Sequence, residues 1–126
     1  MLKIKKRRDQ DTDLICYDIY ITRGDSGYIG LELVDDHDQV IDVGDNDTIR
    51  CQVRKEPNDG EIVFNGTIEK SEDTYVWHIL PENTRGKDVA AEYWYDIEIE
   101  FSNGDVFTFV PTSKFALMSE TTMVEG

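Results

Sequence analysis

Apolar and polar residues alternate along most of the chain, and this two-residue period is typical of half-buried β-strands. The clearest case is residues 93–101, where every odd-numbered position is aromatic or aliphatic and three of the four even-numbered positions are acidic. No window repeats its apolar residues with the period of a helix. The predicted strands are residues 14–23, 28–34, 39–43, 48–55, 62–68, 74–80, 93–101, 106–110 and 114–118.

Turn-forming residues separate these strands at a spacing of about 8–12 residues, which is typical of an antiparallel sandwich. We therefore predict an all-β fold, an antiparallel immunoglobulin-like β-sandwich of about eight strands. A chain of 126 residues fits one domain, which we place at residues 14–119. The longest stretch without a strand pattern, residues 81–91, predicts at most one short helical turn, near residues 85–91 and centred on 88–91.

The turn signal at residues 102–105 joins two strands, and it allows two registers. A two-residue loop places Phe107 and Phe109 on the polar face. A three-residue loop with a bulge pairs Phe101 with Phe107. The same register places Ile99 opposite Phe109, so that both rings are buried. Because each buried Phe contributes roughly 1.5–3 kcal/mol, we predict the bulged register.

Charge is distributed unevenly. The chain has 13 Lys and Arg and 27 Asp and Glu, a formal net charge of −14. Five of the basic residues lie in the first eight positions, so the other 118 residues carry a net charge of −19. Nucleic-acid binding by this acidic body is disfavoured, because phosphates would be repelled. We expect residues 1–13 to be a flexible arm that could also contact a polyanion or an acidic partner, and 120–126 to be a flexible tail.

Hydropathy and the positions of the cysteines indicate in which cellular compartment the chain is expected. No stretch approaches the roughly 20 apolar residues of a transmembrane helix, and no apolar run follows the basic start, as it would in a secretory signal. Cys16 occupies the polar face of its predicted strand and Cys51 the apolar face of another. Thiols that point in opposite directions do not meet disulfide geometry, so we expect both to be reduced, in a reducing compartment.

Residues with catalytic or metal chemistry form no recognised motif. His37 lies in an Asp-rich turn and His78 at an outward strand position, and neither has a serine or cysteine at a motif-defining position. The oxygen-rich segment 42–47 lacks the glycine and glutamate positions of an EF-hand loop, so either a weak calcium site or an ordinary tight turn remains open. We predict no enzymatic activity, no catalytic residues, no cofactor and no metal site.

Three aromatic residues occupy polar-face positions, namely Tyr20, Tyr28 and Trp94. Half-exposed aromatics are common on strands, but they also anchor protein interfaces. These three are therefore the candidate interface residues. The alternative function is that of a carbohydrate-binding module, in which two or three coplanar exposed rings would stack on sugars.

The order of several short segments resembles a known family. Ile21-Thr22-Arg23-Gly24-Asp25-Ser26 closes the first strand, and Gly44-Asp45 precedes Thr48-Ile49 of the middle strand. Leu80-Pro81-Glu82-Asn83-Thr84 and then Tyr93-Trp94-Tyr95-Asp96-Ile97 follow. Over about residues 14–122 this run is similar to the N-terminal β-sandwich domain of upper baseplate proteins from phages and prophages of Gram-positive bacteria.

This resemblance implies a non-enzymatic structural module of a virion tail or baseplate. Its expected partners are other copies of itself, as a homo-oligomer, and other tail or baseplate proteins. The implied location is the virion, after synthesis in the bacterial cytoplasm. Neither a nucleic acid nor a membrane is expected as a partner.

Overall fold

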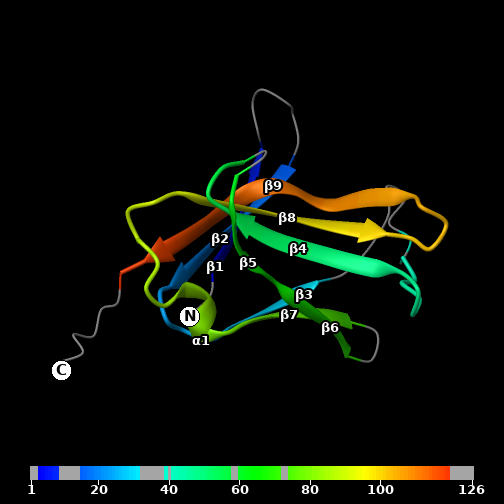
Figure 1. Ribbon diagram of the computed structural model, residues 1–126, viewed down its shortest axis with the longest axis horizontal. Coiled ribbons are helices and arrows are strands. Elements are labelled where there is room, and N and C mark those ends of the chain that lie inside the picture. The colour runs from blue at the N-terminus through cyan, green and yellow to red at the C-terminus, as the bar shows by residue number, and fades with distance from the viewer. Residues whose placement is uncertain are drawn as a thin grey trace.

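The computed structural model describes residues 3–8, 15–31, 39, 41–57, 60–71 and 74–119. The elements are β1 (Lys3–Arg8), β2 (Ile15–Thr22), β3 (Gly27–Leu31), β4 (Thr48–Arg54), β5 (Ile62–Asn65), β6 (Thr67–Ser71), β7 (Thr74–Ile79), α1 (Pro81–Thr84), β8 (Tyr93–Glu100) and β9 (Val106–Met118). One sheet has the order β1-β2-β9-β8-β4-β5 and the other the order β3-β7-β6. Figure 1 shows these sheets as two packed layers. The chain is an immunoglobulin-like β-sandwich, as predicted.

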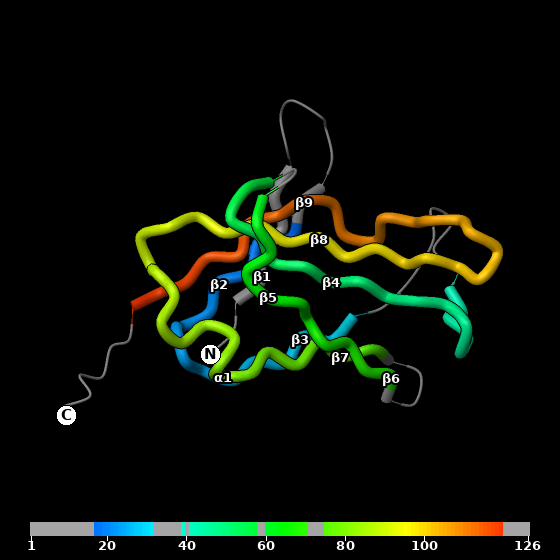
Figure 2. Tube along the Cα trace, viewed as in Figure 1, coloured from blue at the N-terminus to red at the C-terminus, as the bar shows by residue number. Residues whose placement is uncertain are grey.

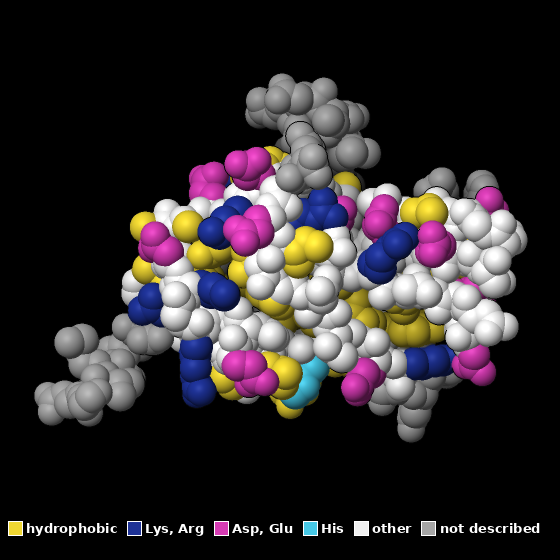
Figure 3. All heavy atoms as spheres, viewed as in Figure 1, with side chains coloured by type: hydrophobic (Ala, Val, Ile, Leu, Met, Phe, Trp, Pro, Cys, Tyr) yellow, Lys and Arg dark blue, Asp and Glu magenta, His cyan; other side chains and the backbone are white. Residues whose placement is uncertain are grey.

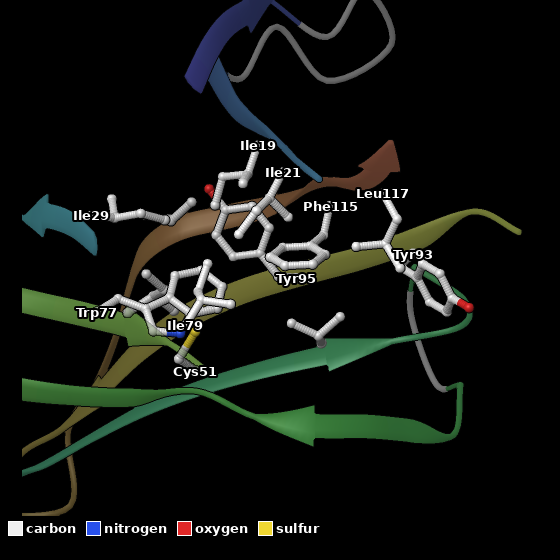
Figure 4. Packing of buried hydrophobic residues seen from close by; sticks show 13 residues of the cluster. Ile19, Ile21, Ile29, Cys51, Trp77, Ile79, Tyr93, Tyr95, Phe115 and Leu117 are labelled. Carbon is white, nitrogen blue, oxygen red and sulfur yellow. The ribbon is translucent and has the colours of Figure 1, made fainter. Parts of the chain in front are cut away.

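The core fills the space between the two layers. Burial alternates along β8, whose odd-numbered residues are buried and whose even-numbered residues are partly exposed. At the centre, the rings of Trp77, Tyr95 and Phe115 lie 5.4, 5.8 and 6.4 Å apart between centroids. Cys51 points inward beside Trp77, as its position in the alternation predicted (Figure 4), and it forms no disulfide. The side chain of Cys16 lies outside the described part of the chain.

The connection from β7 to β8 contains a feature of immunoglobulin-like sandwiches. The hydroxyl of Tyr93, at the start of β8, accepts a hydrogen bond from the backbone N–H of Asp88 at 3.1 Å. A tyrosine at this corner that binds the backbone a few residues upstream is the tyrosine corner of the fold. It holds the loop before β8 against the end of the sandwich.

The helical turn lies earlier than predicted. It spans Pro81–Thr84, not the region near 85–91. Proline is favoured at the first position of a helix, and the side chain of Asn83 accepts the N–H of Leu80 at 2.8 Å, which satisfies one N-terminal donor. The hydroxyl of Thr84 accepts the N–H of Gly24 at 2.7 Å, which ties the helix to the turn after β2.

Three predictions about the strands were wrong. Part of the expected N-terminal arm forms β1, which pairs antiparallel with β2. β1 was not predicted because its many Lys and Arg residues leave no alternation of apolar and polar positions. Such charged residues are nevertheless common on edge strands. The pairing of β2 with β9 is parallel, so the large sheet is not wholly antiparallel. Residues 41–43 form no strand, although Ile41 and Val43 pack against the core as loop residues.

The predicted strand 62–68 is two strands in different sheets. β5 pairs with β4, and β6 pairs with β7. Figure 2 follows the chain as it passes from the upper layer to the lower one between them. The change occurs at Gly66, where a Cβ atom would lie 2.7 Å from both Cys51 Sγ and Trp77 Nε1. Only glycine fits this close approach to the core.

The hairpin between β8 and β9 has a three-residue loop, as predicted, but its register differs. Phe101 donates its N–H to the carbonyl oxygen of Asp105 at 2.8 Å. Gly104, with φ of 94°, donates to the carbonyl oxygen of Phe101 at 2.9 Å. Phe107 therefore pairs with Ile99 rather than with Phe101. The loop itself sets these pairs, because a turn over residues 102–104 places Phe101 opposite Asp105 and therefore Ile99 opposite Phe107.

β9 is one strand where two were predicted, and its register shifts at two places. The first shift leaves Phe109 as the extra residue of a bulge, so that Phe107 and Phe109 both pack against the core. The second lies beside Pro111, which has no N–H for the ladder. There the hydroxyl of Ser113 donates to the carbonyl oxygen of Pro111 at 2.8 Å and accepts the N–H of Tyr17 at 2.9 Å.

Candidate interaction surface

One row of side chains crosses the outer face of the six-stranded sheet. Strand pairing places Arg54 of β4 opposite Ile62 of β5 and opposite Trp94 of β8. Trp94 in turn pairs with Lys114 of β9. These four residues are termed the Trp94 row. Ile62 is 45% exposed, an unusually open position for a large aliphatic side chain.

Trp94 pairs with a basic residue on each of its two neighbouring strands. Lys114 Nζ is 5.9 Å from the centroid of the Trp94 ring, within range of a cation–π interaction. On the other side, the guanidinium of Arg54 donates to the side-chain oxygen of Gln52. The backbone beneath is fixed as well, because the N–H of Lys114 binds the buried carboxylate of Asp18 at 3.0 Å.

The acidic residues on this face lie beside arginines. Burial raises the pKa of the Asp96 carboxyl, and the charge of Arg54 opposes that rise. Arg50 Nε lies 3.7 Å from Glu98, and its Nη2 lies 3.5 Å from Glu100. Cations therefore offset the acids of this face, although the whole chain carries −14.

The structure separates the three predicted interface residues. Tyr20 shares the outer face of the large sheet with Trp94, because it pairs with Ala116, the next outward residue after Lys114 on β9. Tyr28 lies on the opposite surface of the molecule, on the outer face of the three-stranded sheet. The three rings therefore do not form one sugar-stacking platform, although Tyr20 and Trp94 remain on one face.

Sequence reasoning did not single out Arg54, Lys114 or Ile62. Alternation in the predicted strand 48–55 already places Arg54 on the polar side. The missing information was which strands are neighbours, since only the order β5-β4-β8-β9 aligns these side chains with Trp94.

The oxygen-rich segment 42–47, considered above as a weak calcium site, uses its Asp47 carboxylate in hydrogen bonds to the backbone. The carboxylate of Asp47, in the 42–47 segment, accepts the N–H of Gly44 at 2.7 Å and of Ser102 at 2.8 Å. It thereby links this turn to the β8–β9 hairpin. Within the described ranges, no three His, Cys, Asp or Glu residues are placed to hold a metal ion. His37 lies outside those ranges.

A cleft of about 300 Å³ lies between β5 and the loop before β8. Its rim carries an ion pair, with Lys55 Nζ 3.5 Å from Glu61. The lining residues are Lys55, Glu61, Ile62, Val63, Gly86, Lys87, Asp88 and Tyr93. They include no histidine, cysteine or serine, so the lining offers no nucleophile–base pair of the kind that catalyses acyl transfer.

The helical part of the described chain is too short to cross a membrane.

No known protein family matches the chain, and no curated protein sequence matches it. Among solved structures, the chain is similar to murine CRIg, with 11% sequence identity and a TM-score of 0.37. The similarity covers 94% of this chain and 98% of that chain.

Proposed function

We propose that this chain is a non-enzymatic structural module of a phage or prophage tail or baseplate, and that it acts through protein–protein contacts. The Trp94 row is the observation that carries the contact function. Trp and Arg are among the residues most enriched in interface hot spots, and here Trp94 and Arg54 lie side by side on an outer sheet face. The tail or baseplate setting rests on the resemblance of the segments around Arg23, Leu80 and Trp94.

The distribution of charge supports a docking role for this face. Excess negative charge keeps free copies of a protein apart and soluble. Contact between copies is then favoured where the charge is locally balanced, as it is along Arg50, Arg54 and Lys114 with their acidic neighbours. The proposed partners are further copies of this chain and other tail or baseplate proteins, and the proposed location is the virion.

Mass spectrometry of purified particles tests the proposal. Particles released by the strain that encodes this chain are expected to contain it in several copies each. Particles from a strain in which Trp94→Ala replaces the native residue are expected to lose the chain or to assemble poorly, because the anchor of the contact is gone. Complete, infective particles that lack the chain would overturn the proposal.

Carbohydrate binding is the second candidate, because Tyr20 and Trp94 share one face. A glycan array with the purified chain separates the two functions. Specific glycan binding that disappears in both Tyr20→Ala and Trp94→Ala would favour the carbohydrate function. The contact function predicts no glycan signal that depends on either ring.

A further inference from the structure

The outer face of the three-stranded sheet presents a second surface, opposite the Trp94 row. Across the strands, Tyr28 pairs with His78, and His78 with Thr67; in the next outward row, Gly30 pairs with Val76, and Val76 with Glu69. This surface is termed the Tyr28 face. Its members are Tyr28, Gly30, Thr67, Glu69, Val76 and His78.

Tyr28 is held in place although it is 65% exposed. Its ring stacks on His78 with a centroid distance of 4.3 Å and an interplanar angle of 10°. Among the residues that the structure describes, β3 pairs with β7 alone, so no further strand from that part of the chain covers the other side of the ring. Tyr28 is therefore an ordered aromatic surface that is open to a partner.

Gly30 lies next to Tyr28 on the same face and leaves the backbone bare. A Cβ atom at Gly30 would meet no heavy atom within 4 Å, so nothing inside the molecule requires glycine there. Glycine inside a strand often marks a site where another chain approaches closely. On this face the exposed ring of Tyr28 therefore lies next to a position that has no side chain.

The charged residues of the Tyr28 face and of the Trp94 row have opposite sign, and acidic neighbours offset part of the positive charge around the Trp94 row. The Tyr28 face contains Glu69 and no Lys or Arg, whereas the Trp94 row contains Arg54 and Lys114. Figure 3 shows acidic, basic and hydrophobic side chains together along the lower layer, where this sheet lies. Tyrosine rings attract Lys and Arg, as do carboxylates.

We propose that copies of this chain stack face to back, with the Trp94 row of one copy against the Tyr28 face of the next. This inference rests on the proposed role of the Trp94 row in protein docking. Arg54 and Lys114 then approach Tyr28 and Glu69 of the neighbour, and Gly30 leaves room for the indole. Because the two surfaces lie on opposite sides of the sandwich, every copy keeps one of each free. Such a heterologous contact builds a ring or an open chain of copies.

A mixing experiment with two blocked variants tests this arrangement. Trp94→Glu removes the first surface and leaves the second, whereas Tyr28→Glu does the reverse. In sedimentation velocity, the wild-type chain is expected to form species larger than a dimer as its concentration rises. Each variant alone stays at the 14.5 kDa of one chain, and an equimolar mixture forms a complex of twice that mass and no larger.

Other contact geometries give different patterns. If Tyr28→Glu alone dimerises, the Trp94 row binds its own copy; if Trp94→Glu alone dimerises, the Tyr28 face does so. Either result overturns face-to-back stacking, as does a wild-type chain that remains monomeric at every concentration. Particle mass spectrometry is independent of these outcomes, so the proposed function can stand or fail separately.

Two further variants protect the test against misfolding. Lys114→Glu changes an exposed residue of the Trp94 row and keeps the indole, and it is expected to weaken stacking at least about tenfold, because like charges then face each other. Ala90→Glu adds one negative charge, as Trp94→Glu and Tyr28→Glu do, in an exposed turn on neither surface, and it is expected to leave stacking unchanged. Circular dichroism confirms that each variant is folded.

Discussion

Gly66 lies where the chain leaves the six-stranded sheet for the three-stranded one, directly against the core. A methyl group there would come within 2.7 Å of the sulfur of Cys51 and of the indole nitrogen of Trp77. Both of these side chains are buried, so neither can move without disturbing its neighbours. We expect Gly66→Ala to lower the free energy of unfolding by about 1–3 kcal/mol, the usual cost of overpacking a core. Urea denaturation measures this, and an unchanged midpoint would contradict it.

Asp96 gives the stability of the protein a predictable dependence on pH. Burial raises the pKa of this carboxyl in the folded chain above its unfolded value. The folded state therefore binds the proton more tightly, and stability falls as the pH rises from the unfolded pKa through the folded one. Asp96→Asn carries no titrating group at this position. The free energy of unfolding of the wild type minus that of Asp96→Asn should decrease as the pH rises through this window.

Urea denaturation of both proteins at a series of pH values, from acid to neutral, gives this difference. A difference that stays constant with pH would contradict the shift. Glu92→Gln, a change of an exposed carboxyl in the loop before β8, is a matched control.

The turn between β8 and β9 depends on the backbone conformation of one glycine. Gly104 has φ of 94°, in the region that disfavours side chains, yet a Cβ atom there would meet nothing within 4 Å. Gly30 in β3 is equally open but has ordinary strand geometry. We expect Gly104→Ala to cost about 1–2 kcal/mol of stability, and Gly30→Ala to be neutral or slightly stabilising. Thermal unfolding compares them, and equal effects would show that φ is not the cause.

Alternation predicted the elements that have one buried face and one exposed face. β8 and β4 were recognised for this reason, as was the outward position of Trp94. β1 was missed because its Lys and Arg residues dominate its composition, and because an edge strand needs less apolar surface. The parallel pairing of β2 with β9 joins segments almost 100 residues apart, and no local pattern encodes such a contact.

The candidate site was predictable only in part, for the same reason. The alternation of apolar and polar residues within each strand indicates which residues point outward, so Tyr20, Tyr28 and Trp94 were identified from the sequence. The sheet to which a strand belongs depends on packing across the whole chain. That membership separates Tyr28 from the other two and brings Arg54 and Lys114 beside Trp94.

On the scale of the whole molecule, five of the thirteen basic residues lie in one edge strand, and the rest of the chain is strongly acidic. Five of the six residues of β1 are Lys or Arg, and β1 is the outermost strand of the large sheet. Lysine on an edge strand discourages unselective pairing with other chains. The other outer strand of that sheet, β5, has four residues, and a short edge has the same effect. Both outer strands of the large sheet are thus poorly suited to pairing with other chains, which favours the sheet faces for the proposed contacts.

Residues 9–126 carry a net charge of −19. Repulsion among these like charges opposes the compact state. Salt at about 0.15 M limits such forces to roughly 8 Å, whereas close ion pairs such as Arg50 with Glu98 are affected less. We therefore expect the melting temperature to rise by a few degrees between low salt and 0.15 M, since 1 kcal/mol corresponds to roughly 4 °C for a domain of this size. Calorimetry at low protein concentration separates this effect from association.

A double variant, Asp45→Asn with Glu92→Gln, should melt higher at low salt and respond less to added salt. If salt instead lowers the melting temperature of the wild type, local ion pairs outweigh the overall repulsion.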